Sequence, residues 1–445
     1  MGKEKNKSID DMEAYLRRQG RVLDCNLPPP DQKPALMVVI PAMEEPELLR
    51  VLHDLSNATP PECPVEVLVV FNMPGDAPAA PWQAHEDLRR KCTDWMADAS
   101  RPGLRFIALN AGRLNPREAG VGLARKLGMD MAVHRLREAH GAGHMAESGI
   151  IACLDADCRV DGNYLTALHG HFVKFPASPG CALYFEHALE QEAGDLPETV
   201  LASEPAALAR DGIARYELHL RVVVEGLRQA GHPHPFHTVG SAMAVRAGAY
   251  CRQGGMNRRK GAEDFYFLDK IFQLGDFTNL TGTTVRPSAR VSARVPFGTG
   301  RAMGDWLAGR GGLTTHDPQA YWDLARLIRA APGLWDATPE AVAGLVASLP
   351  SPLRSYLESQ GFERGWMEMR ANAAGPEGFL KRFWGWLNRF RVLKYMNHAQ
   401  QWLPRGDVGE AAHALLRSRN HPAPLPPPSE VEALLMCYRE LDRVG

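Results

Sequence analysis

The stretch Ile150–Asp157 reads IIACLDAD, an apolar run that ends in two acids one residue apart. A short apolar run of this kind is typical of a strand buried on both faces of a sheet. Because side chains alternate along extended backbone, Asp155 and Asp157 should point to one side and reach the same hard cation. In the alternative, Asp157 caps a turn and Asp155 is solvated, and the D-x-D spacing alone does not separate the two.

Three further apolar runs precede this one and alternate with helix-like segments. The runs are 35–40, 65–71 and 104–109, and the helix-like segments are 46–57, 82–98 and 118–140. Strand–helix–strand alternation predicts right-handed crossovers and a largely parallel sheet, hence an α/β fold. Ligands bind such sheets at the carboxyl ends of the strands, where the two aspartates are expected.

The composition narrows the class of protein. A chain of 445 residues suggests two or three domains, and a net charge of -1 argues against a general nucleic-acid binder. No apolar run approaches the roughly 20 residues that span a bilayer, and eight scattered cysteines without a C-x-x-C pair fit a reduced, cytoplasmic protein. We predict an N-terminal helix and proline-rich linker (1–33), an α/β domain (34–304) and a helical C-terminal domain (305–445).

The order of motifs along residues 35–302 resembles the family 2 glycosyltransferases. The motifs are VVIPAMEEPELLRVL, VEVLVVFNMPGD, AGVGLARKLGMDMA, LDADCRVDGNYL, TVGSAMAV, GGMNRRKGAEDFYFLDK and SARVPFGTGRA. The resemblance implies a GT-A fold, with a Rossmann-like, mostly parallel sheet flanked by helices and an α-helical C-terminal region. It also implies hexosyltransferase-type transfer from a nucleotide-sugar donor to a glycan, lipid-linked or small-molecule acceptor.

Candidate site residues follow from the same resemblance. It implies donor contacts from Pro41, Ala42, Glu44, Asn72, Arg125, Asp155, Gly240, Ser241 and Arg301. It implies Mn²⁺ or Mg²⁺ held by Asp155 and Asp157, with Asp157 a direct ligand. In that family an aspartate often contacts the base where Asn72 stands, so the identity of the base stays open. A solvated helix arginine is the alternative for Arg125.

The acids Glu263 and Asp264 open a predicted helix after a basic, glycine-rich loop. Acids in a first helical turn are also favoured by the macrodipole and by capping, which is the structural alternative. An inverting sugar transfer needs a carboxylate that takes the proton of the acceptor hydroxyl, and the resemblance assigns this base to the Glu-Asp pair. We expect Asp264 to be the base and Glu263 to orient the substrate or loop. A retaining transferase and a non-catalytic sugar-nucleotide-binding module remain alternatives.

Arginines downstream could stabilise the leaving diphosphate, because a guanidinium fork suits its oxygens. The candidates are Arg290, Arg294 and Arg301, with Arg301 the first choice. The histidines of 232–237 lack a Cys or His partner pair at a spacing that suits zinc, so a rigid proline loop is favoured there. His237, beside the expected sugar loop, is a minor candidate for the active site.

The C-terminal segment 381–399 interleaves aromatic and basic residues at helical spacing. An interfacial membrane helix has this composition, and would place the protein peripherally at the inner face of the membrane. We favour the alternative that the aromatic side chains pack on the catalytic domain and the basic face is solvated.

Overall fold

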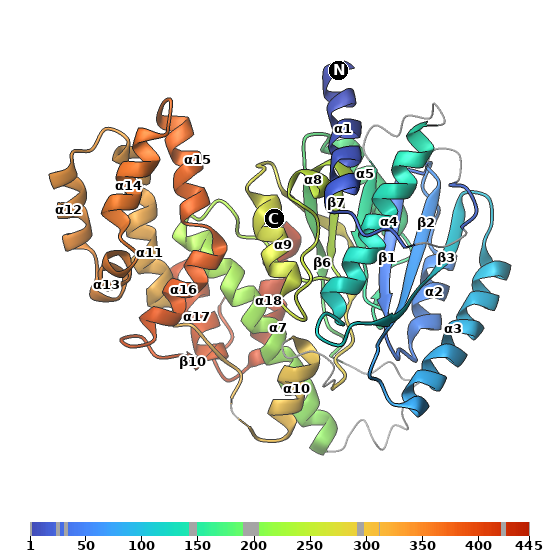
Figure 1. The fold of residues 1–445 in the computed structure, drawn as a ribbon. Helices are drawn as coiled ribbons and strands as arrows, with labels where there is room; N and C mark the ends of the chain where they lie inside the picture. Colours follow the sequence, from blue (N-terminus) through green and yellow to red (C-terminus); the bar gives the residue numbers. More distant parts are fainter. Residues whose placement is uncertain are drawn as a thin grey trace. The chain divides into compact units, whose positions relative to one another are not determined.

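The computed structural model describes residues 2–23, 27–30, 34–141, 149–189, 204–291, 298–310, 312–419 and 424–444. Two compact units are present (Figure 1). Unit 1 comprises Met1–Glu192, Thr238–Gly304 and Asp442–Gly445, and unit 2 comprises Ala193–His237 and Asp305–Leu441. The chain therefore leaves unit 1 and returns to it before the C-terminal helices begin.

Unit 1 is built on an eight-stranded mixed sheet in the order β3-β2-β1-β4-β7-β6-β8-β5. Its strands are β1 Leu36–Ala42, β2 Val65–Pro74, β3 Leu104–Leu114, β4 Ile150–Cys153, β5 Arg159–Val160, β6 Gly180–Phe185, β7 Met243–Arg246 and β8 Thr278–Arg286. The first four strands are parallel to one another, as predicted. Strand β7 runs antiparallel between β4 and β6, and β8 is again parallel to β6.

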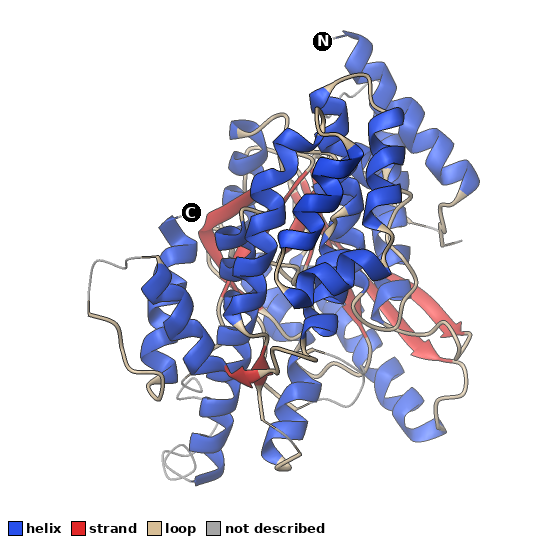
Figure 2. Cartoon of the chain, turned by 90° about the vertical axis from the view of Figure 1, so that its left-hand side faces the viewer, coloured by secondary structure: helices blue, strands red, loops and turns tan. Residues whose placement is uncertain are grey.

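Helices flank this sheet, which confirms the α/β class (Figure 2). The helices of unit 1 are α1 Gly2–Arg18, α2 Leu48–Asn57, α3 Ala79–Ala99, α4 Val121–Gly141, α5 Tyr164–Lys174, α8 Ala247–Arg252 and α9 Glu263–Phe272. The helix α10 (Thr299–Leu307) begins in unit 1 and ends in unit 2. The crossovers through α2 and α3 lead from β1 to β2 and from β2 to β3, whereas the crossover through α4 leads back from β3 past β1 to β4. Because such crossovers are right-handed, α4 lies on the opposite face of the sheet from α2 and α3.

The helix α4 lies unusually close to the sheet. It packs on β1 and β2, whose side chains are almost entirely buried. A Cβ atom at Gly128 would lie 2.4 Å from a methyl carbon of Val39 and 2.8 Å from one of Val70. Only glycine permits this approach without displacing the strands. The apolar strands and this glycine therefore fix the position of α4, which matters because α4 carries Arg125.

The N-terminal helix α1 is anchored on the same helix. The Tyr15 hydroxyl donates to Asp130 Oδ1 at 2.6 Å and accepts from Lys126 Nζ at 2.6 Å, in a buried cluster. Asp130 and Lys126 both belong to α4. A Cβ at Gly255 would fall 2.0 Å from the Tyr15 hydroxyl oxygen, so α1 also rests on the loop that leads to α9. The helix α1 therefore supports both α4 and the loop that precedes α9.

In its described residues, unit 2 consists of helices and connecting loops apart from the two-residue strands β9 (Thr314–Thr315) and β10 (Gly406–Asp407). Its helices are α7 Glu204–Ala230, α11 Pro318–Ala330, α12 Pro339–Ser348, α13 Ser351–Ser359, α14 Phe362–Ala371, α15 Pro376–Trp386, α16 Arg389–Ala399, α17 Val408–Ser418 and most of α18 Val431–Val444. The predicted helical C-terminal region is thereby confirmed. The long helix α7 was not expected from the sequence.

The aromatic segment 381–399 is not one helix. It is split between α15 and α16, where Asn388 caps α16 by accepting from the backbone N–H of Arg391 at 2.9 Å. Phe383 and Tyr395 are fully buried in the core of unit 2. These two aromatic side chains are therefore part of the core of unit 2. Peripheral membrane contact through 381–399 stays a prediction. Among the described residues no helix has the length and apolarity to cross a membrane.

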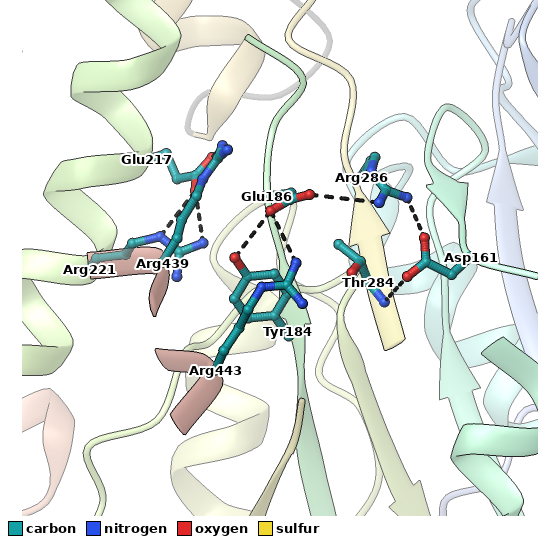
Figure 3. Close-up of polar contacts among 9 residues, drawn as sticks. All are labelled: Asp161, Tyr184, Glu186, Glu217, Arg221, Thr284, Arg286, Arg439 and Arg443. Atoms are coloured by element: carbon teal, nitrogen blue, oxygen red, sulfur yellow. Dashed lines mark hydrogen bonds and ion pairs between the residues drawn. The ribbon is translucent and has the colours of Figure 1, made fainter. Parts of the chain in front are cut away.

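A buried ion-pair network ties α18 to α7 within unit 2. Glu217, which has no exposed surface, accepts from Arg221 at 2.7 Å and from Arg439 at 2.8 Å (Figure 3). Figure 3 also shows a separate network at the ends of β6 and β8 in unit 1. There Arg286 pairs with Asp161 at 2.6 Å and with Glu186 at 3.7 Å.

Candidate active site

One edge of the sheet collects the carboxyl ends of six of the described strands. The pairings make β1, β2, β3 and β4 parallel, and two antiparallel steps through β7 make β6 and β8 point the same way as β4. The strand order also reverses between β1 and β4, because β2 and β3 lie on the other side of β1. Ligands bind α/β sheets at such a reversal, in the crevice outside the strand ends.

Asp155 and Asp157 stand at this reversal, directly after β4. The backbone turns there, with the Cys158 N–H donating to the Asp155 carbonyl at 3.2 Å. The side chains of Asp155 and Asp157 are 39% and 23% exposed, so both carboxylates are open to a ligand. Each also meets an arginine: Asp155 pairs with Arg125 at 2.6 Å, and Asp157 pairs with Arg290 at 3.1 Å.

Arg125 is an internal residue and not a solvated one. Its side chain is 2% exposed, and its guanidinium joins Asp155 to Glu263, with a short hydrogen bond to the latter. Three segments far apart in sequence (α4, the end of β4 and the start of α9) therefore meet at one cation. Arg125 therefore holds the carboxylates of Asp155 and Glu263, a role that was not predicted from the sequence, and its contact with the donor stays a prediction.

Glu263 and Asp264 begin α9 at the same cluster. The preceding residue, Ala262, has the left-handed conformation (φ 55), and Asn257 Nδ2 donates to the Glu263 carbonyl at 2.8 Å. Asp264 Oδ1 accepts from the Phe265 N–H at 2.7 Å, so the acid also satisfies an orphan donor of the first turn. Both the structural and the chemical roles considered for this pair are compatible with the geometry.

The two acids have perturbed acidities. Burial, and to a smaller extent the neighbouring Asp264, raise the pKa of Glu263 to about 7 against the lowering effect of Arg125. Burial also raises the pKa of Asp264, while Arg125 and a backbone hydrogen bond from Phe265 oppose the shift. A carboxylate with a raised pKa is a stronger base than a solvated one, which suits proton abstraction near neutral pH.

Gly240 and Ser241 lie in the loop that leads into β7, the strand antiparallel to β4, and contact the cluster. They precede β7, whose Met243 is paired with Cys153 of β4. A Cβ at Gly240 would lie 2.6 Å from Arg125 Nη1, so the missing side chain makes room for the guanidinium. Ser241 is buried and its side chain hydrogen-bonds the Cys158 thiol. The small-residue loop thus packs on Arg125 and on the turn after Asp157.

The loop after β1 contributes Glu45, a residue that was not predicted from the sequence. Pro41 and Ala42 end the strand, and Glu44 is exposed with a left-handed backbone (φ 48). The next residue, Glu45, is buried and forms a short ion pair with Arg290. The adjacent acids Glu44 and Glu45 are indistinguishable in sequence, and only the turn decides which of them points inward.

Asn72 lies on β2 where the pairing with β3 shifts register, between Phe71 and Asn72. Its side chain is buried, and its Oδ1 atom has no hydrogen-bond partner within the described part of the chain. A buried amide oxygen without a hydrogen-bond partner destabilises the folded state, so this atom is a candidate to accept a hydrogen bond from a ligand. This observation favours the predicted role of Asn72 on the nucleoside side.

The downstream arginines are distributed differently from the expectation. Arg290 follows β8 and lies in the cluster, whereas Arg301, the first choice, is an exposed residue of α10. Arg294 lies outside the described residues. His232 is buried and its ring nitrogen Nε2 is 3.0 Å from the Leu387 carbonyl oxygen, within unit 2. Burial lowers the pKa of His232 to about 3, so it is a neutral, hydrogen-bonded core histidine.

The cluster carries an excess of negative groups. Five carboxyl groups and two guanidinium groups form it: Glu45, Asp155, Asp157, Glu263 and Asp264 with Arg125 and Arg290. In the described residues no set of three or more His, Cys, Asp or Glu is arranged to hold a metal ion. A cation at the Asp155–Asp157 pair would accordingly take its other ligands from a substrate or from water.

Comparison with known proteins gives distant structural similarities. No protein-family model matches the chain, and the search of curated proteins found no match. A structure of TarS 1-349 from S. aureus is 12% identical, covers 82% of this chain and 90% of that chain, and has a TM-score of 0.37. The same protein in complex with UDP-GlcNAc is 13% identical over 92% of this chain and 90% of that chain, with a TM-score of 0.36.

A second similar structure is the mannosyltransferase PcManGT from Pyrobaculum calidifontis in complex with GDP-Man and Mn²⁺. It is 15% identical and has a TM-score of 0.36, and the match covers 99% of this chain and 94% of that chain. At this level of similarity, what the present chain does has to be worked out from its own residues.

Proposed function

We propose that the chain is a metal-dependent, inverting glycosyltransferase that moves a sugar from a nucleotide-sugar donor to an acceptor hydroxyl. The observation that carries the proposal is the meeting of Asp155 and Asp157 with Glu263 and Asp264 around Arg125, at the strand edge where the sheet order reverses. A cation-binding acid pair and a basic carboxylate in one cluster are the two parts such a reaction needs.

The donor set fits a hard divalent cation such as Mn²⁺ or Mg²⁺. Asp155 and Asp157 supply two accessible carboxylates at a strand end. A donor diphosphate is an anion, and a cluster with more carboxylates than guanidiniums repels it unless positive charge is added. A bound cation would supply that charge, and would stabilise the diphosphate as it leaves.

The proposed base is Asp264. In the reaction, the acceptor oxygen forms a bond to the anomeric carbon, the bond from that carbon to the phosphate oxygen breaks, and the acceptor proton passes to the Asp264 carboxylate. The raised pKa of Asp264 favours this transfer. Glu263 is held by Arg125 and therefore serves better to orient the site than to accept a proton.

The remaining residues divide between the parts of the donor. Asn72, with Pro41, Ala42 and Glu44 on the neighbouring strand end, would contact the nucleoside. Gly240 and Ser241 would face the sugar, because their loop lies on the Asp155–Cys158 turn. Arg290 is better placed than Arg301 to meet the diphosphate, since it already contacts Asp157.

Two variants test the proposal separately. Asp157→Asn should abolish Mn²⁺-dependent binding of UDP or GDP in calorimetry, because it removes a charged ligand. Asp264→Asn should keep nucleotide binding but slow the release of nucleoside diphosphate from nucleotide-sugars by about 10²–10⁴-fold, the range for a lost general base. Asp87→Asn, an exposed residue of α3, is the control.

The outcomes distinguish the alternatives. If Asp157→Asn binds nucleotide and Mn²⁺ like the wild type, the cation site is elsewhere. If Asp264→Asn retains full turnover, the base is Glu263 or another residue, and the anomeric configuration of the product then decides between inversion and retention. Nucleotide-sugar binding without any turnover in the wild type would favour the non-catalytic module.

A further inference from the structure

Arg290 contacts Asp157 where the proposed cation would bind, so it would compete with the cation for this carboxylate. Its guanidinium lies 3.1 Å from Asp157 Oδ2 and also pairs with the buried Glu45. Arg290 comes from the segment after β8, Asp157 from the turn after β4 and Glu45 from the loop after β1. The contact is therefore a tertiary one, made by three strand ends.

The two arginines of the cluster differ in their freedom to move. Arg125 is 2% exposed, has carboxylates on two sides, and has Gly240 packed against its guanidinium. Arg290 is 29% exposed. An ion pair that is partly exposed is weak and exchangeable, whereas breaking a buried one is costly. Asp155 thus has a permanent partner, and Asp157 has a replaceable one.

Glu45 gives Arg290 a second attachment that survives the exchange. Its side chain is 7% exposed, so the charge of Glu45 needs a partner whether or not a cation is present. Arg290 meets both Glu45 and Asp157 through Nη2, so a guanidinium that gives up Asp157 can keep Nη2 on Glu45 and turn its Nη1 side outward. Its free N–H groups then suit two phosphate oxygens, which arginine binds in a forked geometry.

We propose that Arg290 is the resident counter-ion of the cation site: it neutralises Asp157 until a divalent cation displaces it, and it then binds the donor diphosphate while anchored on Glu45. This inference rests on the proposed function, because it takes Asp157 to be a cation ligand. Arg290 is on this view a specificity-determining residue that weakens binding of the cation alone and strengthens binding of cation and nucleotide together.

The test uses Arg290→Gln in the full chain. Titration with MnCl₂ alone, followed by calorimetry or by the electron paramagnetic resonance of free Mn²⁺, should show tighter binding than in the wild type by about tenfold, the equivalent of about 1.4 kcal/mol. With Mn²⁺ saturating, UDP and GDP should both bind more weakly. The matched control is Arg286→Gln, which removes the same charge from β8 but pairs with Asp161 and Glu186.

The two expected effects of Arg290→Gln, tighter Mn²⁺ binding and weaker nucleotide binding, have opposite signs, so a general loss of structure cannot produce both. Tighter Mn²⁺ binding in Arg290→Gln but not in Arg286→Gln supports the proposal. If Arg290→Gln binds Mn²⁺ no better than the wild type, while Asp157→Asn loses Mn²⁺, Arg290 is no competitor and the proposal fails although the proposed function stands. If wild type and Asp157→Asn take up Mn²⁺ alike, the cation site itself is wrong and both fall.

Discussion

Replacing Arg125 by methionine tests the electrostatic centre of the site. The guanidinium is the shared partner of Asp155 and Glu263, and it is almost fully buried. Removing one partner of a buried pair costs about 3–5 kcal/mol in the free energy of unfolding, because a carboxylate is left without compensation. Most of this cost should come from Glu263, which is 5% exposed, since Asp155 is open enough to regain water.

The expected loss in the free energy of unfolding depends on pH, and its direction follows from the raised pKa of Glu263. In the wild type the pKa of Glu263 is raised to about 7 from its ordinary value of 4.5, so the folded chain holds this proton more firmly than the unfolded chain. Stability contributed by the protonated form is therefore lost as the pH rises from about 4.5 to about 7. Without Arg125 the pKa should rise further, and Arg125→Met should be more destabilising at pH 8 than at pH 5.

Chemical denaturation at the two pH values measures both effects. The control is Arg258→Met, which removes a surface pair with Glu118 at 2.8 Å and should cost about 0–1 kcal/mol at either pH. The double variant Arg125→Met with Glu263→Gln should recover a large part of the loss, because the uncompensated charge is gone. A cost for Arg125→Met no larger than that for Arg258→Met, or one independent of pH, would show that Arg125 does not hold these acids.

Two further variants test the close approach at Gly240 and the network in unit 2. Gly240→Ala should displace the Arg125 guanidinium, because the added Cβ would lie 2.6 Å from Nη1, and should weaken Mn²⁺-dependent nucleotide binding in calorimetry. Gly162→Ala, where a Cβ meets nothing within 4 Å, should bind normally. Equal binding by the two variants would contradict the crowding at Gly240. Glu217→Gln leaves two buried arginines facing a neutral amide and should lower the free energy of unfolding by about 3–5 kcal/mol, whereas Glu432→Gln, which breaks an exposed pair with Arg210, should cost about 0–1 kcal/mol. Similar denaturation midpoints for these two glutamine variants would refute the assignment.

The elements that local pattern determines were predictable. The apolar runs before Asp155 appear as β1–β4, and the parallel pairing follows from their alternation with helices. The strands β6, β7 and β8 were missed, because their pairing is partly antiparallel and depends on neighbours distant in sequence. The break between α15 and α16 was also missed, although Asn388 is a good capping residue, because the aromatic spacing continues across it.

The candidate site shows the same division. Asp155 and Asp157 were expected at the sheet edge, and the structure places them there, because a strand end is a local property. Arginine partners are not local. Arg290 and Arg301 look alike in sequence, but only the first follows β8 back to the edge, and this depends on the position of β8 beside β6.

The arginine contacts also change the cation affinity expected of Asp155 and Asp157. Two carboxylates at a strand end, considered alone, would attract any cation in solution. Here Asp155 and Asp157 are each paired with one guanidinium, and the two arginine side chains are 2% and 29% exposed. Under the proposed function, a free cation would compete at Asp157 with a group already in place, while a nucleotide that also engages this group would offset the competition. Selectivity for cation and nucleotide together would then follow from the unequal burial of two arginines, without a third protein carboxylate.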